Sequence, residues 1–440
     1  MSATAVALLS LGLMLLLIWG GLHVAVVLGL VSFVGVWIIR DDIGVAANLL
    51  AQASSDAIAS HIFGVVPLFV LTGFLVAKAD IGKDAFEVAN QLFRRLRGGL
   101  GVATVASNAV FAAITGISIA SAAVFTRVAV PEMAHHGYRT SFAAGTVAGS
   151  SVLGMMIPPS LLMIIYGVLA EESIGRMFIA GIIPGALLAL GFCVLIVGMA
   201  WLVPHKVGTP EALAGTGAGI EETPLTAAIK FVPILLLITL VLGGLYAGFF
   251  TPTEAGAVGA AGALVIALVR GRLTWRKLWQ VLVETGFVSV SVLFLIIAAM
   301  LYSRMLALTG MPSAVTEGIT NMGLGPWGFL FMYVLIVIAL GCIIDSVSIM
   351  LIMLPIVLPI ATAFQMDLIW FGVLTVVAVE VGLLTPPFGV SVYTVKSALN
   401  NPSITIRDIF AGTFPFVLVM VLALVVLAAF PGLSTWLARM

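Results

Sequence analysis

Two double prolines stand inside apolar segments of the sequence. The first lies in "GMMIPPS", which begins at Gly154, and the second lies in "GLLTPPF", which begins at Gly382. A proline inside a helix removes a backbone hydrogen bond and clashes with the preceding turn, which costs about 3 kcal/mol. The backbone groups freed at such a break can serve a ligand, because carbonyls coordinate cations and a helix N-terminus favours anions.

Small polar residues interrupt two other apolar segments. Gly116, Ser118 and Ser121 break the first, and Asp345 and Ser346 stand in the middle of the second. Sodium and other hard cations need several oxygen ligands, which backbone carbonyls, hydroxyl groups and one carboxylate can supply. Two polar tips and two broken helices that meet would therefore form one composite site for cations and an anion.

The polar segments and the double prolines belong to an internal repeat. An offset of 228 residues relates Pro158 to Pro386 and Ser118 to Ser346. It also relates Pro131 to Pro359 and Gly82 to Gly310. Such a fixed register predicts two copies of one structural unit. Repeat 1 covers residues 1–205, a cytoplasmic loop covers 206–225, and repeat 2 covers 226–434.

Basic residues indicate that the two copies have opposite orientations. Repeat 1 carries "RRLR" at residues 94–97, where repeat 2 has the uncharged "MGLG". Repeat 2 carries "RGRLTWRK" at residues 270–277, where repeat 1 has no basic residue. Basic residues near membrane spans favour the cytoplasm. Corresponding loops therefore lie on opposite faces, which is an inverted-topology repeat and places both termini in the periplasm.

The composition predicts an all-α polytopic membrane protein. The chain has 440 residues, of which 62% are hydrophobic and 9% charged, and about 20 apolar residues suffice to span a bilayer. We expect five spans per repeat, and amphipathic helices along the cytoplasmic surface at 80–97 and 270–282. The expected spans are 3–20, 22–39, 62–79, 140–169, 177–203, 227–249, 253–269, 283–308, 368–394 and 409–430.

Two apolar segments are too long for one crossing and too interrupted for two. Residues 98–134 and 325–362 carry the polar tips at their centres. Irregular backbone at membrane depth is tolerated where it lines a cavity or is buried in protein. We therefore expect a re-entrant hairpin in each repeat, followed by a span that the double proline breaks, at 140–169 and 368–394.

The residues around these features resemble the large membrane subunit of tripartite ATP-independent periplasmic (TRAP) transporters, of the DctM type. The resemblance rests on "TGISIASAAVFTRVAVPEMAHHGY", "AGSSVLGMMIPPSLLMIIYG" and "GLLTPPFGV". It implies a sodium-coupled, elevator-type importer of small organic acids in the bacterial inner membrane. It also implies a periplasmic substrate-binding protein and a small four-helix membrane subunit. No extra helices precede the first repeat, so a separate small subunit is expected.

The resemblance also implies which residues form the site. Cation-binding residues would be the polar residues of the two tips and of the second break, with Asp345 as the charged member. Substrate-binding residues would be Ser160, the four prolines and Tyr166. The cation set comprises Thr115, Gly116, Ser118, Asp345, Ser346 and Thr385, and the prolines are Pro158, Pro159, Pro386 and Pro387.

Several of these residues have a structural alternative. Asp345 could pair with an arginine, and Tyr166 could be a packing residue. Glu380 could be a proton site, a cation ligand or a hydrogen-bonding packing residue. Arg127 could pair with an acid or a substrate carboxylate, or could be a structural charge near the membrane surface.

The sequence argues against other classes of function. Balanced charge indicates no nucleic-acid partner, and the absence of a P-loop motif gives no indication of ATP use. No cofactor other than the coupling sodium is expected, and no enzymatic activity. One alternative is a stand-alone cation-coupled carboxylate symporter, and another is an intramembrane enzyme or proton-translocating subunit. The latter needs a chain of buried acids, whereas only Asp345 and Glu380 lie deep in apolar segments.

Overall fold

The computed structural model describes residues 3–59, 61–213, 223–321, 323–399, 401 and 403–440. These residues form helices connected by short turns, and their one isolated β-bridge joins Tyr138 to Gly208. The central part of the predicted cytoplasmic loop, residues 214–222, lies outside the described residues.

The first half of the chain supplies the following elements. They are α1 (Ala3–Trp19), α2 (Val24–Arg40), α3 (Ile43–Ala59), the 3-10 helix η1 (His61–Gly64), α4 (Val65–Lys78), α5 (Ile81–Phe93), α6 (Gly99–Thr115), α7 (Ser118–His135), α8 (Thr140–Ser151), α9 (Leu153–Met156), α10 (Leu161–Leu169), α11 (Ile174–Leu202), α12 (Pro204–Val207) and α13 (Pro210–Leu213).

The second half repeats this order with local differences. Its elements are α14 (Pro224–Ile238), the π-helix η2 (Thr239–Gly243), α15 (Gly244–Tyr246), α16 (Pro252–Val269), α17 (Trp275–Thr309), α18 (Met311–Asn321), α19 (Pro326–Gly341), α20 (Ser346–Ala363), α21 (Leu368–Leu383), α22 (Val390–Leu399), α23 (Ile406–Ala429), α24 (Gly432–Thr435) and the 3-10 helix η3 (Leu437–Arg439).

Local sequence signals start several of these helices. Thr251 and Glu254 form a capping box at the start of α16, and Pro252 occupies a first-turn position where its missing N–H is not needed. Thr405 and Asp408 form a second capping box at the start of α23. These caps satisfy backbone N–H groups that the first turn of a helix leaves without partners.

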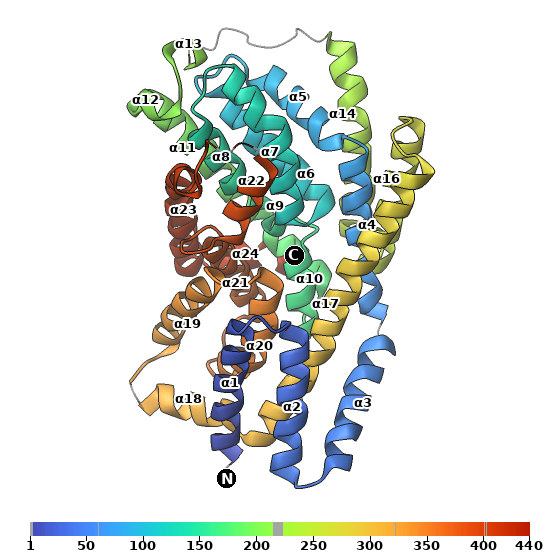
Figure 1. The fold of residues 1–440 in the computed structure, drawn as a ribbon, viewed down its shortest axis with the longest axis vertical. Helices are drawn as coiled ribbons and strands as arrows, with labels where there is room; N and C mark the ends of the chain where they lie inside the picture. Colours follow the sequence, from blue (N-terminus) through green and yellow to red (C-terminus); the bar gives the residue numbers. More distant parts are fainter. Residues whose placement is uncertain (1–2, 60, 214–222, 322, 400, 402) are drawn as a thin grey trace.

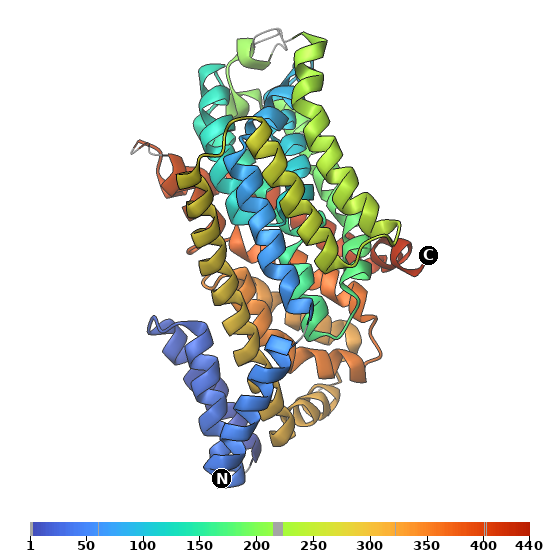
Figure 2. The same ribbon diagram turned by 90° about the vertical axis from the view of Figure 1, so that its right-hand side faces the viewer.

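The helices pack as two groups that lie side by side (Figures 1 and 2). The frame helices are α1–α4 and α14–α17, in which α17 packs on α2 and α4, and α16 packs on α4. The hairpin bundle is α6–α11 with α19–α23, in which α8 packs on α7 and α23, and α19 packs on α21. Contacts of α17 with α20 and of α4 with α6 join the two groups.

The predicted amphipathic helix at 270–282 is wrong. Residues 275–309 form one continuous helix, α17, whose first turn contains Arg276 and Lys277, whereas Arg270 and Arg272 lie in the connection before it. The corresponding part of the first half is divided, because η1 separates α3 from α4. The second-half counterpart of the amphipathic α5 is instead α18, and Figure 1 shows these two helices at opposite ends of the molecule.

Long apolar helices make the chain a multi-pass membrane protein. Among the described residues, seven helices are long and apolar enough to cross a membrane, or eight if α4 and α5, bent by 63°, count as one span. Six of the ten predicted spans are among these seven helices, and the seventh is α20, one arm of the predicted second hairpin. The other four predicted spans fall on shorter helices, namely α1 and α2 with 17 residues each, α21 with 16 and α4 with 14. Only 17% of the most apolar window in Leu225–Tyr246 is buried in the protein, so this helix exposes its side chains for contact with lipid or a partner.

Candidate functional site

The first polar segment is the tip of a helical hairpin. Helix α6 ends at Thr115, Gly116 follows with a φ of +64°, and α7 begins at Ser118. A left-handed residue at this position is a common helix C-cap and favours glycine. The hydroxyl of Thr115 donates to the carbonyl of Phe111 at 2.9 Å, and Thr115 and Ser118 are both buried.

The first double proline interrupts the helical segment between Thr140 and Leu169. The bond between Pro158 and Pro159 is cis, and helix α10 starts again after Ser160. Ser160 is fully buried and caps α10, because its Oγ accepts from the Met163 N–H at 3.3 Å. The same hydroxyl donates to the carbonyl of Met155 at 2.5 Å. Ser160 therefore links the two sides of the break.

In each half the broken helix is hydrogen-bonded to the hairpin that precedes it. In the first half, the Leu161 N–H donates to the Gly116 carbonyl at 3.1 Å. In the second half, the Phe388 and Gly389 N–H groups donate to the Cys342 carbonyl at 3.2 and 3.4 Å. The structure thus brings together tips and breaks that are more than 40 residues apart in the sequence.

The second tip differs from the first by a charge at its turn. Asp345 is the N-cap of α20, and its Oδ1 accepts from the Ser348 N–H at 3.1 Å. Asp345 is half-buried, whereas Ser346 and Ser348 are buried. At the second break, Thr385 Oγ1 donates to the Val381 carbonyl at 2.7 Å. The cis-linked Pro386 and Pro387 are exposed, in contrast to the buried Pro158 and Pro159.

One contact connects the first tip to the second half of the chain. The Ser118 hydroxyl donates to Oε1 of Glu380, on α21, at 3.5 Å. Glu380 is fully buried, and its Oε2 has no hydrogen-bond partner among the described residues. A buried carboxylate oxygen without a donor is energetically unfavourable and calls for an explanation such as a bound ion or proton.

A second polar network lies inside the hairpin bundle. The Ser121 hydroxyl donates to Oδ1 of Asn108, and Asn108 Nδ2 donates to the Ser150 hydroxyl at 2.6 Å. All three residues are buried. The sequence analysis did not identify Asn108 as a site residue, although an amide in the middle of an apolar hairpin was a usable signal.

A cavity of about 960 Å³ opens between the frame helices and the second tip. Asp345, Ser348 and Phe388 line it from the hairpin bundle, and His23 and Ser291 line it from the turn between α1 and α2 and from α17. Nothing in the sequence indicated that His23 and Ser291 face Asp345, because the three residues lie on segments that only tertiary packing brings together.

Among the predicted site residues, Asp345 lines this cavity, and two others lie away from both the cavity and the tips and breaks. Tyr166 is fully buried, does not line this cavity, and donates its hydroxyl to the Leu368 carbonyl at 2.6 Å. Its ring packs closely against Gly372. Arg127 is exposed on α7, nine residues beyond Ser118. The position of Tyr166 fits a packing residue, and that of Arg127 fits a structural charge.

The polar atoms at the tips and breaks of the two halves are mainly oxygens. They are the hydroxyls of the tips and breaks, backbone carbonyls and two carboxylates. Among the residues that the structure describes, no group of three or more His, Cys, Asp or Glu forms a transition-metal site. Such an oxygen set suits a hard monovalent or divalent cation.

The chain is similar to known membrane permeases along almost its whole length. Residues 11–433 match the family described as "Tripartite ATP-independent periplasmic transporter, DctM component". The C4-dicarboxylate TRAP transporter large permease protein DctM of Pseudomonas aeruginosa is 33% identical, over 84% of each chain. The protein of the same name from Rhodobacter capsulatus is 32% identical over 97% of this chain and 98% of its own.

Other similarities indicate the range of substrates and the fold. The ectoine TRAP transporter large permease protein TeaC of Halomonas elongata is 27% identical over 97% of this chain and 96% of its own. The crystal structure of the YdaH transporter of Alcanivorax borkumensis superposes with a TM-score of 0.59 at 14% identity. That match covers 84% of this chain and 86% of the other, and it supports the fold alone.

Proposed function

Because the chain belongs to the DctM family and is a large permease subunit of a TRAP transporter, we propose that it couples sodium entry to the import of small organic acids. The observation that carries this proposal is the meeting of the first tip with both halves of the chain. Gly116 accepts from Leu161 at the first break, and Ser118 donates to Glu380 in the second half.

Sodium is the proposed coupling ion because the site offers oxygen donors from both repeats. Thr115, Gly116 and Ser118 contribute from the first tip, and Asp345 and Ser346 from the second tip with Thr385 from the second break. The orphaned Oε2 of Glu380 marks a place where a bound cation would compensate a buried charge. Ion binding at both tips would hold the breaks closed over the substrate.

The proposed substrate position is the region where the second tip meets the cavity. Phe388 lines this cavity and corresponds to Ser160 of the first break. Ser160 is buried in this state, so its proposed hydroxyl contact with substrate requires the first break to open. A carboxylate substrate cannot bind directly to Asp345, because like charges repel in a site of low dielectric constant. A cation bound between Asp345 and the substrate carboxylate would attract both groups. Cation binding would then favour substrate binding, which is a physical basis for coupling the two.

The proposed partners follow from the family. A periplasmic substrate-binding protein would deliver the organic acid, and a small four-helix subunit would pack against this chain in the bacterial inner membrane. Both termini are proposed to be periplasmic. The proposed movement is a displacement of the hairpin bundle relative to the frame helices, which form separately packed groups.

Uptake into proteoliposomes tests the proposal. The vesicles would contain this chain and its small subunit, with the cognate binding protein and [14C]succinate outside. Uptake that needs both an inward sodium gradient and the binding protein supports the proposal. Uptake without the binding protein would indicate a stand-alone symporter, and uptake driven by a proton gradient alone would overturn the sodium assignment.

A further inference from the structure

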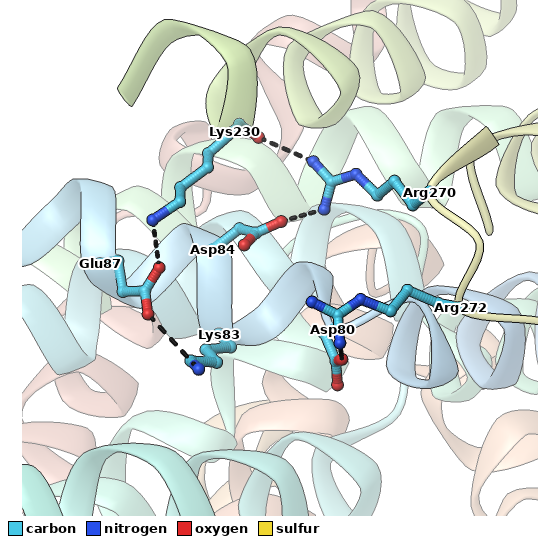
Figure 3. Close-up of polar contacts among 7 residues, drawn as sticks. All are labelled: Asp80, Lys83, Asp84, Glu87, Lys230, Arg270 and Arg272. Carbon is cyan, nitrogen blue, oxygen red and sulfur yellow. Dashed lines mark hydrogen bonds and ion pairs between the residues drawn. The ribbon is translucent and has the colours of Figure 1, made fainter. Parts of the chain in front are cut away.

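Two acidic residues of α5 and its N-cap Asp80 pair with three basic residues from the frame helices and their connection (Figure 3). Glu87 lies 2.6 Å from Nζ of Lys230, Asp80 lies 3.3 Å from Arg272, and Asp84 pairs with Arg270. The acids occupy positions 80, 84 and 87, which share one helix face. The three bases come from α14 and from the connection between α16 and α17.

The central pair connects three segments rather than two. Arg270, at the end of α16, binds Asp84 through Nη1 and donates through Nη2 to the Lys230 carbonyl at 3.4 Å. The Asp84 and Arg270 side chains are only 15% and 20% exposed. A guanidinium group that bonds two partners fixes their relative geometry more firmly than a single surface pair does.

The opposite face of α5 makes a different kind of contact. Ile81, Gly82, Ala85, Phe86 and Ala89 are buried, and a Cβ atom on Gly82 would lie 2.8 Å from Val124 on α7. This apolar face packs on both α6 and α7. Apolar contacts are non-directional, so they can form again with new partners after the hairpin shifts relative to α5. The ion-pair face has defined partners and cannot shift without breaking them.

The Asp84–Arg270 pair is partly buried, and its formation removes water from both charges. Helix α5 is amphipathic and bends away from the apolar α4. Burial raises the pKa of Asp84 above its usual value despite the hydrogen bond and attraction from Arg270. The loss of hydration therefore outweighs the attraction, as is common for partly buried ion pairs. Separation of the Asp84–Arg270 pair would leave a partly buried charge without its partner, so the pair fixes the position of α5 even where its net contribution to stability is small.

The turn that follows α5 leads to the hairpin bundle. Residues 94–98 connect α5 to α6, and Gly98 in this turn has a φ of +80°. Arg97 lies over the ring of Trp201 on α11, with its Cζ 4.6 Å from the ring centroid. The frame therefore holds the chain before this turn, and the hairpin bundle holds it after the turn.

We propose that the ion pairs of Asp80, Asp84 and Glu87 fasten α5 to the frame, so that the α6–α7 hairpin pivots at residues 94–98 and slides past a stationary α5 during transport. This inference rests on the proposed transport function and assigns to these residues a positioning role in it.

A chemical cross-link between α5 and α14 tests the proposal. Cys193 and Cys342 would first be replaced by alanine. Glu87→Cys with Lys230→Cys would then be linked by a short bifunctional maleimide in proteoliposomes. We expect [14C]succinate uptake within about twofold of the same variant without the linker. A loss of tenfold or more on linking would overturn the proposal, because it would show that α5 must leave the frame.

A matched cross-link examines the other face of α5. Gly82→Cys with Val124→Cys, oxidised to a disulfide, joins α5 to α7, and we expect this disulfide to abolish uptake and a reducing agent to restore it. Uptake that continues with this link in place would also overturn the proposal. The cysteine-free parent and the two double-cysteine variants without a link are the controls for transport. If none of these three proteins takes up substrate, the proposed transport function fails, and this result differs from a failure of the positioning role.

A charge exchange provides a test that does not depend on cross-linking. Asp84→Arg and Arg270→Asp should each lower the maximal uptake rate by about fivefold or more, with little change in apparent KM. The double exchange should restore the rate to within about twofold of the parent. Failure of the exchange to restore uptake in a correctly folded protein would count against the positioning role.

Discussion

The hydroxyl of Ser118 lies 3.5 Å from the carboxylate of Glu380, although 262 residues separate them in the chain. Ser118 is at the tip of a hairpin in the first repeat, and Glu380 is on α21, in the second repeat five residues before Thr385 at the break. The contact places an acidic side chain of one repeat at the turn of the other. Ion binding at this position would therefore act on both halves together.

Glu380→Gln should weaken sodium coupling without unfolding the protein. The amide keeps the shape of the side chain and can still accept from Ser118, but it removes the negative charge. We expect the sodium concentration for half-maximal uptake to rise about tenfold, which corresponds to about 1.4 kcal/mol. The double variant Glu380→Gln with Ser118→Ala should change the free energy of sodium binding by less than the sum of the two single changes, because the two residues contact each other. An unchanged sodium dependence would count against a coupling role.

Gly116→Ala should damage the first tip. The alanine would carry the left-handed conformation, which costs about 1–2 kcal/mol, and its Cβ would lie 2.3 Å from the Pro159 carbonyl oxygen. Gly310→Ala is the matched control, because Gly310 has a φ of +66° and nothing within 4 Å of such a Cβ. Thermal unfolding in detergent should show a larger loss for Gly116→Ala, and only that variant should lose uptake. Equal losses of thermal stability and uptake in the two variants would mean that the contact between the first tip and the first break contributes to neither.

Asp345→Asn removes the negative charge at the second tip but keeps a side chain that can cap α20. Asparagine is as good an N-cap as aspartate, so the bond to the Ser348 N–H is retained and the unfolding temperature should hardly change. Sodium-dependent uptake should fall at least tenfold if the carboxylate binds the cation. Asp345→Ala, which removes the cap as well, should also lower stability by about 1 kcal/mol. Normal uptake by the asparagine variant would leave Asp345 with a capping role alone.

Tyr166→Phe should affect stability rather than transport. The substitution removes the part-buried hydrogen bond to the Leu368 carbonyl, and a typical intramolecular hydrogen bond contributes about 0.5–1.5 kcal/mol. We expect a lower unfolding temperature and an apparent KM within about twofold of the parent. A KM that rises tenfold at unchanged stability would instead place the hydroxyl in contact with substrate.

The sequence by itself determined the features that neighbouring residues encode. Gly116, the two double prolines and the cap at Asp345 act on backbone within a few residues, so their effect on a helix can be predicted locally. The constant offset of 228 residues showed that these signals occur twice, and the motifs around them identified the family. The same local logic failed at 270–282, because nothing in that segment stops the helix that continues through α17.

Only the tertiary structure decided which distant side chains meet. The partners of Glu380, the carbonyl that Tyr166 binds, and the position of His23 across the cavity from Asp345 depend on how separate helices pack. An apolar helix in a membrane protein has no hydrophobic preference for one neighbour over another, because lipid is as apolar as the protein interior. Close packing and the need to satisfy buried polar groups select the partners, and those conditions exist only in the assembled fold.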